Sequence, residues 1–147
     1  MINQTPIAVY IHFPYCKSRC PYCDFFRSIL PKTFEEKEII ERYRQDIKYF
    51  ADLMGDRLVK SIFFGGGTPS LLSPNGVQMI LDELSRNFCI KKDAEISLEA
   101  NPNTFAIFEN IADRVKAHNW VGECHELDLL IPSPLVSTQF EHIHTSV

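Results

Sequence analysis

Three cysteines near the start of the chain carry the clearest chemical signal in the sequence. Cys16, Cys20 and Cys23 have the spacing C-x3-C-x2-C and follow directly on an apolar segment. Thiolates are the usual ligands of iron–sulfur clusters, and a cubane cluster of four irons is usually held by four of them. Three ligands on one loop leave one iron able to bind another molecule, as the open position of a catalytic zinc does. The spacing therefore predicts a 4Fe-4S cluster with one reactive iron.

Two other interpretations of these cysteines stay open. The Cys-Pro-Tyr-Cys tetrapeptide at residues 20–23 is also typical of thiol–disulfide oxidoreductases, in which the first thiolate attacks a disulfide and Cys16 has no role. A zinc site would need a fourth ligand, for which the sequence offers only His12 or the distant Cys89. A disulfide framework is disfavoured, because the five cysteines are odd in number.

A glycine-rich stretch and a carboxylate are the next candidates. The stretch Gly-Gly-Gly-Thr-Pro-Ser at residues 65–70 lacks the lysine of a phosphate loop and the third glycine of a dinucleotide fingerprint. Its glycines would let the backbone approach a ligand closely, or would serve only as a turn. Glu99 ends a predicted strand, and at the end of a strand in a parallel sheet a carboxylate favours a binding role over a purely solvent-exposed one. An exposed, solvated side chain is the alternative.

Composition limits the classes of function. The chain has 147 residues, of which 45% are hydrophobic, so it suits one globular domain with a real core. A net charge of −4 gives no electrostatic argument for nucleic acid binding. We find no basic leader and no run of about 18 apolar residues, and we expect a cytoplasmic protein without an integral membrane segment.

Three strand–helix units position these motifs. The predicted strands span residues 7–13, 59–64 and 94–99, and the predicted helices span 33–54, 73–88 and 105–118. Thr33 and Glu36 form a capping-box pair, Gly55 ends the first helix, and Ser73 with Pro74 begins the second. Apolar spacing predicts the buried helix faces, which consist of Ile39, Ile40, Tyr43, Ile47, Phe50 and Met54, and of Val77, Ile80, Leu81, Leu84 and Phe88.

The order of these units predicts an α/β fold with a parallel sheet. Successive strand–helix units place strands in parallel, with the helices packed outside. The cysteines follow the first strand, the glycines follow the second, and Glu99 ends the third. Since sites in such folds lie at the carboxyl ends of the strands, we expect all three motifs to meet at one edge.

Four short segments share their pattern with a known protein family. They are Tyr10-x-His12-x-Pro14, Cys16-x3-Cys20-Pro-Tyr-Cys23-Asp-Phe25, Phe64-Gly-Gly-Gly-Thr-Pro-Ser70-Leu and Leu98-Glu-Ala-Asn-Pro102. On these segments the chain resembles the radical S-adenosylmethionine (SAM) superfamily, within it the oxygen-independent coproporphyrinogen III oxidase group, and most closely the haem chaperone (HemW) branch. That branch is favoured because Phe25 stands where the oxidases carry an extra cysteine, and because the cysteines begin as early as position 16.

The resemblance implies a set of roles. The fold would be an incomplete radical SAM β/α barrel, and the partners would be SAM, haem or porphyrin, and an electron-donor protein. Haem binding and transfer is the implied function, porphyrinogen oxidation its alternative, and a cluster electron would cleave SAM reductively. The implied cluster ligands are Cys16, Cys20 and Cys23; Tyr10 and Tyr22 would line the SAM site, Gly66, Gly67 and Thr68 would contact its methionine end, and Glu99 would bind SAM through its carboxylate. His12 is assigned no chemical role.

The resemblance covers about residues 7–103 and then stops. We therefore expect residues 1–104 to form the N-terminal part of a radical SAM core, and residues 105–147 to form a helix and a divergent tail. The chain is expected to be a truncated form, which leaves its status as an enzyme open and keeps an inactive remnant as an alternative.

Overall fold

The computed structural model describes residues 5–19, 21, 23, 24 and 26–100. The elements within these residues are β1 (Ile7–Phe13), β2 (Tyr15–Cys16), β3 (Ser28–Ile29), α1 (Glu36–Met54), β4 (Leu58–Gly66), the short 3-10 helix η1 (Pro69–Leu71), α2 (Pro74–Asn87) and β5 (Cys89–Leu98). The helix predicted at 105–118 and the predicted tail lie outside the described residues.

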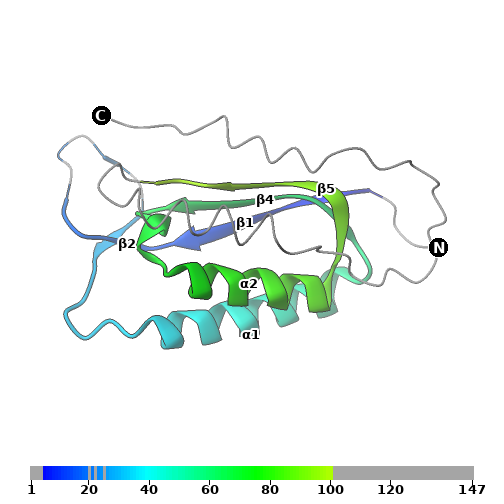
Figure 1. The fold of residues 1–147 in the computed structure, drawn as a ribbon, viewed down its shortest axis with the longest axis horizontal. Helices are drawn as coiled ribbons and strands as arrows, with labels where there is room; N and C mark the ends of the chain where they lie inside the picture. Colours follow the sequence, from blue (N-terminus) through cyan, green and yellow to red (C-terminus); the bar gives the residue numbers. More distant parts are fainter. Residues whose placement is uncertain (1–4, 20, 22, 25, 101–147) are drawn as a thin grey trace.

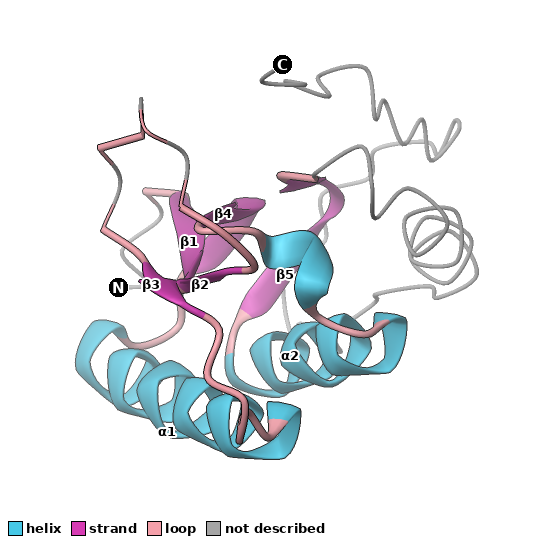
Figure 2. Ribbon diagram, turned by 90° about the vertical axis from the view of Figure 1, so that its left-hand side faces the viewer, coloured by secondary structure: helices cyan, strands magenta, loops and turns pink. Residues whose placement is uncertain are grey.

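The main sheet is parallel and has the strand order β1-β4-β5, so neighbours along the chain are neighbours in space. Both helices, α1 and α2, lie on the same side of this sheet (Figures 1 and 2). In the described part of the chain the helices cover one face of the sheet, which is the arrangement of a β/α barrel, whereas a doubly wound sheet has helices on both faces. The predicted parallel α/β fold is confirmed. None of the helices in the described part is long and apolar enough to cross a membrane.

The core lies between the sheet and the two helices. Alternate strand residues point toward the helices, as the period of two requires. Those that are buried there include Ile11, Phe13, Val59, Ile62, Phe64, Ile90 and Leu98, packed in one cluster with Ile39, Ile40 and Ile47 of α1 and Val77, Ile80, Leu81 and Leu84 of α2. The predicted buried face of the second helix is confirmed, including Phe88 just after it.

The predicted buried face of the first helix is wrong at its C-terminal end. Phe50 is 50% exposed and Met54 is 37% exposed. Ala51, four residues after Ile47, continues the stripe that packs against the core, together with a half-buried Tyr43. Phe50 directly precedes Ala51 and so points to a different side of the helix. The small Ala51, and not the large Phe50, therefore faces the core.

The helix termini confirm one prediction and correct another. Ser73 caps α2, since its side chain accepts a hydrogen bond from the Gly76 amide at 3.0 Å. The capping box expected from Thr33 is wrong, because α1 begins after Glu35 without a side-chain cap. The Glu36 carboxylate instead accepts hydrogen bonds from the Ser73 amide at 2.5 Å and the Ser73 hydroxyl at 2.8 Å. This carboxylate therefore ties the start of α1 to the start of α2.

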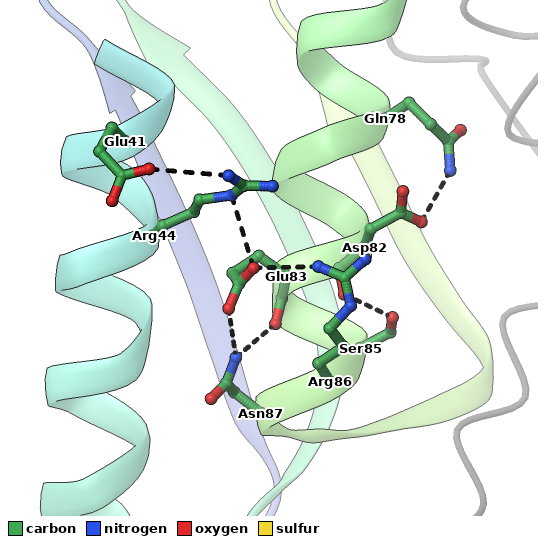
Figure 3. A network of polar contacts seen from close by, with 8 residues as sticks. All are labelled: Glu41, Arg44, Gln78, Asp82, Glu83, Ser85, Arg86 and Asn87. Carbon is green, nitrogen blue, oxygen red and sulfur yellow. Dashed lines mark hydrogen bonds and ion pairs between the residues drawn. The ribbon is translucent and has the colours of Figure 1, made fainter. Parts of the chain in front are cut away.

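A polar network joins the outer sides of the two helices (Figure 3). Arg44 of α1 lies 3.5 Å from a carboxylate oxygen of Glu83 on α2 and 3.6 Å from one of Glu41 on its own helix. Arg86 adds a contact of 3.1 Å to Glu83. Ion pairs near the surface contribute little, typically about 0–1 kcal/mol, so the apolar layer beneath them dominates the packing of these helices.

The third strand begins earlier than predicted. Leu58 pairs with Cys89 and Val59 with Ile90, and after an irregularity the ladder resumes with Ser61 opposite Glu95. The charged residues 91–93 lie in that irregular stretch. They break the alternating pattern, which is why the pattern predicts a strand only from residue 94.

Candidate functional site

The carboxyl ends of the three sheet strands meet at one edge of the molecule, because the strands are parallel. The paired positions there are Phe13 with Gly66 and Phe64 with Leu98. The cysteine segment follows β1, the glycine stretch begins with the last two residues of β4, and Glu99 follows β5. The structure thus brings these motifs together as expected, while their roles stay predictions.

The cysteine loop is closed at its base by a small parallel ladder that the sequence did not reveal. The Ser28 amide donates to the Pro14 carbonyl at 2.7 Å, and the Leu30 amide donates to the Cys16 carbonyl at 2.8 Å, which pairs β2 with β3. Cys16 is buried, and Cys23 further along the loop is half-buried. Cys20 and Tyr22 lie outside the described residues, so the three-cysteine set stays a prediction.

In the cysteine loop, the sulfurs of Cys16 and Cys23 each accept a hydrogen bond. The Thr68 hydroxyl donates to Cys16 Sγ at 3.4 Å, and Arg27 Nε donates to Cys23 Sγ at 3.0 Å. Hydrogen bonds from neighbouring groups to ligand atoms are a common feature of metal sites, where they orient the ligands. The surroundings of these two cysteines therefore fit ligands of an iron–sulfur cluster. Thr68, predicted to contact SAM, lies next to a cysteine side chain in this structure.

The glycine stretch folds back onto the segment before the cysteines. The Gly67 amide donates to the Phe13 carbonyl at 2.6 Å, and the Thr68 amide donates to the Tyr15 carbonyl at 2.8 Å. Gly66 has φ of 109°, and a Cβ atom at this position would lie 2.6 Å from His12 Nδ1. Only glycine suits that backbone conformation and that space. The turn interpretation is therefore correct in part, and the turn also places Thr68 against Cys16.

Glu99 is held at the same edge by two hydrogen bonds. Its carboxylate Oε2 accepts from the Gly66 amide at 3.2 Å, and its own amide donates to the Phe64 carbonyl at 3.0 Å. The side chain is half-buried, so the interpretation of Glu99 as a fully solvated surface residue does not hold. A carboxylate bound to the glycine stretch is an acceptor suited to the cationic and hydroxyl groups of a ligand.

The sheet face opposite the helices carries Tyr10, His12 and Phe63, and we call it the open face. Tyr10 and Phe63 are neighbours across β1 and β4, with ring centroids 5.9 Å apart and ring planes 17° from parallel. They are 55% and 40% exposed. Partial burial raises the pKa of Tyr10 above its ordinary value, and the negative charge of Glu99 raises it further. Tyr10 therefore stays protonated at neutral pH.

His12 links the open face to the cysteine loop, a role that the sequence interpretation missed. Its Nε2 lies 2.9 Å from the Phe26 carbonyl, and its Nδ1 lies 3.0 Å from the Tyr10 hydroxyl. A carbonyl can only accept, so Nε2 donates to Phe26, and in the neutral ring Nδ1 then accepts from the Tyr10 hydroxyl. The signal was present in the sequence, because residues two apart on a strand share a face.

Comparison with known proteins decides the family. A family model described as the radical SAM superfamily matches residues 10–125. The chain belongs to the radical SAM superfamily. Its membership implies a 4Fe-4S cluster and SAM as cofactors, which agrees with the hydrogen-bonded cysteines and favours a cluster over the thiol-redox and zinc interpretations.

Relatives of this radical SAM chain include haem chaperones and porphyrin enzymes. The chain is 39% identical over 104 residues to the heme chaperone HemW of Escherichia coli, an alignment that covers 71% of this chain and 28% of the relative. It is 27% identical over 117 residues to the oxygen-independent coproporphyrinogen III oxidase of Salmonella typhimurium, covering 80% of this chain and 25% of the relative. The radical SAM chain thus spans about a quarter of the length of these relatives.

A solved structure supports the same placement. The coproporphyrinogen III oxidase HemN from Escherichia coli, described as a radical SAM enzyme, superposes with a TM-score of 0.68 at 28% identity. The match covers 78% of this chain and 26% of that one. The parallel sheet with helices on one face is therefore part of a radical SAM fold, and the predicted incomplete barrel is confirmed.

Proposed function

We propose that this chain holds the cluster-binding and SAM-binding part of a radical SAM protein of the haem chaperone type. The observation that carries the proposal is the set of hydrogen bonds at the carboxyl edge. Thr68 donates to Cys16 Sγ, and Gly66, two residues before it, donates to Glu99. One short turn thereby connects a predicted cluster ligand with a predicted SAM-binding carboxylate.

The roles follow from this arrangement. Cys16, Cys20 and Cys23 would hold the cluster, which supplies an electron for the reductive cleavage of SAM when it is bound. Glu99 would accept hydrogen bonds from SAM, and the glycine stretch would lie against the methionine end. Tyr10 and Tyr22 would line the SAM site. An oxygen-sensitive cluster is compatible with a reducing compartment, and we place the protein in the cytoplasm.

Haem binding and transfer is the finer part of the proposal. It is supported by relatives named heme chaperone at 38–39% identity, against 27% for the relatives named coproporphyrinogen III oxidase. Phe25 in place of the extra oxidase cysteine points the same way. An electron-donor protein would be the further partner. Porphyrinogen oxidation is the second candidate, supported by the structural similarity to HemN.

The test is anaerobic reconstitution with iron and sulfide, followed by EPR spectroscopy of the reduced protein with and without SAM. We expect about four irons per chain and a spectrum that SAM changes, as a cubane cluster with an open iron requires. Glu99→Gln should retain the iron and weaken SAM binding by roughly tenfold or more, since a hydrogen bond to a charged group contributes about 1.5–3 kcal/mol. Glu95→Gln, an exposed carboxylate earlier on β5, is the matched control.

Three further results would redirect the proposal. If the folded chain takes up no iron, the proposal is wrong, and an inactive remnant or a thiol oxidoreductase becomes the favoured interpretation. Cys16→Ala should abolish the cluster, and a variant that still reduces disulfides would favour the Cys20–Cys23 couple. Haem titration followed by absorbance, set beside an assay of coproporphyrinogen III turnover, separates the chaperone from the oxidase.

A further inference from the structure

The guanidinium group of Arg27 lies along Cys23. Arg27 Nε donates to Cys23 Sγ at 3.0 Å, and Arg27 Nη2 donates to the Cys23 carbonyl at 3.1 Å. Both residues are half-buried and stand four positions apart in the cysteine loop. One planar group therefore contacts the side chain and the backbone of the same predicted ligand.

This two-point contact restricts the orientation of Cys23. The donors of arginine are fixed in a rigid plane, so holding both Sγ and the carbonyl limits rotation of the side chain about its first torsion. Groups outside the metal ligands that orient them in this way typically affect metal affinity by 10–100-fold. The contact is also charged, unlike the one at Cys16, where the donor is the neutral hydroxyl of Thr68 at 3.4 Å.

The charge has a further consequence for a bound cluster. Reduction adds one electron and hence one negative charge, without moving a proton. A cation and an N–H donor at a ligand sulfur stabilise the more negative state, and hydrogen bonds to sulfur are among the determinants of cluster potential. An arginine at Cys23 should therefore make the cluster easier to reduce.

We propose that Arg27 is a positioning residue of the cluster site, which orients Cys23 for iron binding and raises the reduction potential of the cluster. The inference rests on the proposed function, because it requires a cluster bound through Cys23. It concerns a residue outside the cysteine, glycine and Glu99 motifs, and it follows from the Arg27–Cys23 geometry alone.

The test compares Arg27→Gln with Arg19→Gln in the reconstituted protein. Arg19 is exposed in the same loop, so its substitution removes the same charge without a comparable contact. The readouts are the midpoint potential of the cluster by redox titration with EPR detection, and the rate of iron loss to a chelator. For Arg27→Gln we expect about a tenfold smaller equilibrium constant for one-electron reduction, equivalent to about 59 mV, and faster iron loss. Arg19→Gln should resemble the wild type.

The outcomes separate this inference from the function on which it rests. A wild-type chain that binds no iron would overturn both. A cluster whose potential is the same in Arg27→Gln and the wild type, or shifts equally in Arg19→Gln, would overturn the inference alone. If Arg27→Gln cannot assemble a cluster, Arg27→Lys decides, because lysine keeps the charge and loses the planar pair of donors. Faster iron loss in that variant supports the inference, because the two-point contact is lost while the charge is kept, and iron loss as slow as in the wild type contradicts it.

Discussion

The two faces of the main sheet differ in what their residues do. The face toward the helices is aliphatic and aromatic and is closed to solvent, with Ile62 and Phe64 no more than 1% exposed. The open face carries Tyr10, His12 and Phe63, whose side chains form hydrogen bonds and ring contacts with one another and with the cysteine loop. Adjacent residues of one strand thus belong to different environments.

Within a single strand, the residues that face the helices therefore contribute mainly to stability, and those on the open face lie closer to the proposed chemistry. Burial of apolar area against the helices supplies most of the folding free energy, because each large buried side chain contributes about 1.5–3 kcal/mol. The open face leads instead to the carboxyl edge, where Cys16, Cys23, the glycine stretch and Glu99 lie. Substitutions on the helix-covered face should therefore destabilise the fold, whereas substitutions on the open face should mainly weaken ligand binding.

The largest expected effect on stability comes from the helix-covered face. Ile62→Ala should lower the free energy of unfolding by roughly 2–5 kcal/mol, because it opens a cavity in a closed core. Its neighbour Phe63 is the matched position on the open face. Phe63→Ala removes a larger side chain but should cost less, about 1–2 kcal/mol from the stacking with Tyr10 and the area that the 40% exposed ring still buries. Urea unfolding of both variants measures this, and equal losses would contradict the comparison.

A smaller effect is expected at the edge where the two faces meet. Gly66→Ala places a methyl group 2.6 Å from His12 Nδ1 and 2.8 Å from the Phe13 carbonyl, at a φ of 109°. It should cost about 1–3 kcal/mol, as strained non-glycine positions do, and should weaken SAM binding by moving the amide that holds Glu99. Gly55→Ala is the control, because φ is also positive there (67°) and nothing lies within 4 Å of the added atom. Gly55→Ala should cost stability without affecting SAM binding. An unchanged SAM affinity in Gly66→Ala would show that the turn at Gly66 does not contribute to SAM binding.

Sequence patterns predicted what periodicity and turn chemistry determine locally. The first strand was predicted with its observed bounds, since Pro6 and Pro14 enclose an apolar run. The start of α2 at Ser73 and the end of α1 at Gly55 also follow from single residues with strong positional preferences. The convergence of three motifs at one edge required only the inference that the strands are parallel.

The parts that were missed depend on contacts between distant residues. The Glu36 carboxylate looked like a local cap, yet it bonds to Ser73, 37 positions away. The ladder of β2 and β3 involves two residues on each side, too few for a periodic signal. Thr68 bonds to Cys16 across 52 positions, and although Arg27 and Cys23 are only four positions apart, the irregular loop between them has no periodic pattern that would show their contact. Hydrogen bonds of this kind are specified by the fold, and they are the ones that shape the site.

The smallest expected effect concerns the hydrogen bond that joins the helix layer to the strand carrying His12. The Tyr43 hydroxyl on α1 donates to the His12 carbonyl at 2.8 Å. Burial raises the pKa of Tyr43 above its ordinary value of about 10, with smaller contributions from Tyr15, Asp46 and Tyr10. Tyr43→Phe should cost about 1 kcal/mol at pH 7, the net value of one such hydrogen bond.

The pH dependence of stability tests the same bond independently. A group whose pKa is raised by folding stabilises the protein fully below its unfolded pKa, and this contribution is lost as the pH rises toward the folded pKa. The wild type should therefore lose stability above about pH 10, and Tyr43→Phe should lose less over the same interval, so that the two unfolding free energies approach each other. Tyr49→Phe on the same helix is the control, because Tyr49 is 63% exposed. Urea unfolding between pH 7 and pH 11 gives the comparison, and parallel curves for the wild type and Tyr43→Phe would show that the hydroxyl does not stabilise the folded chain through its protonated form.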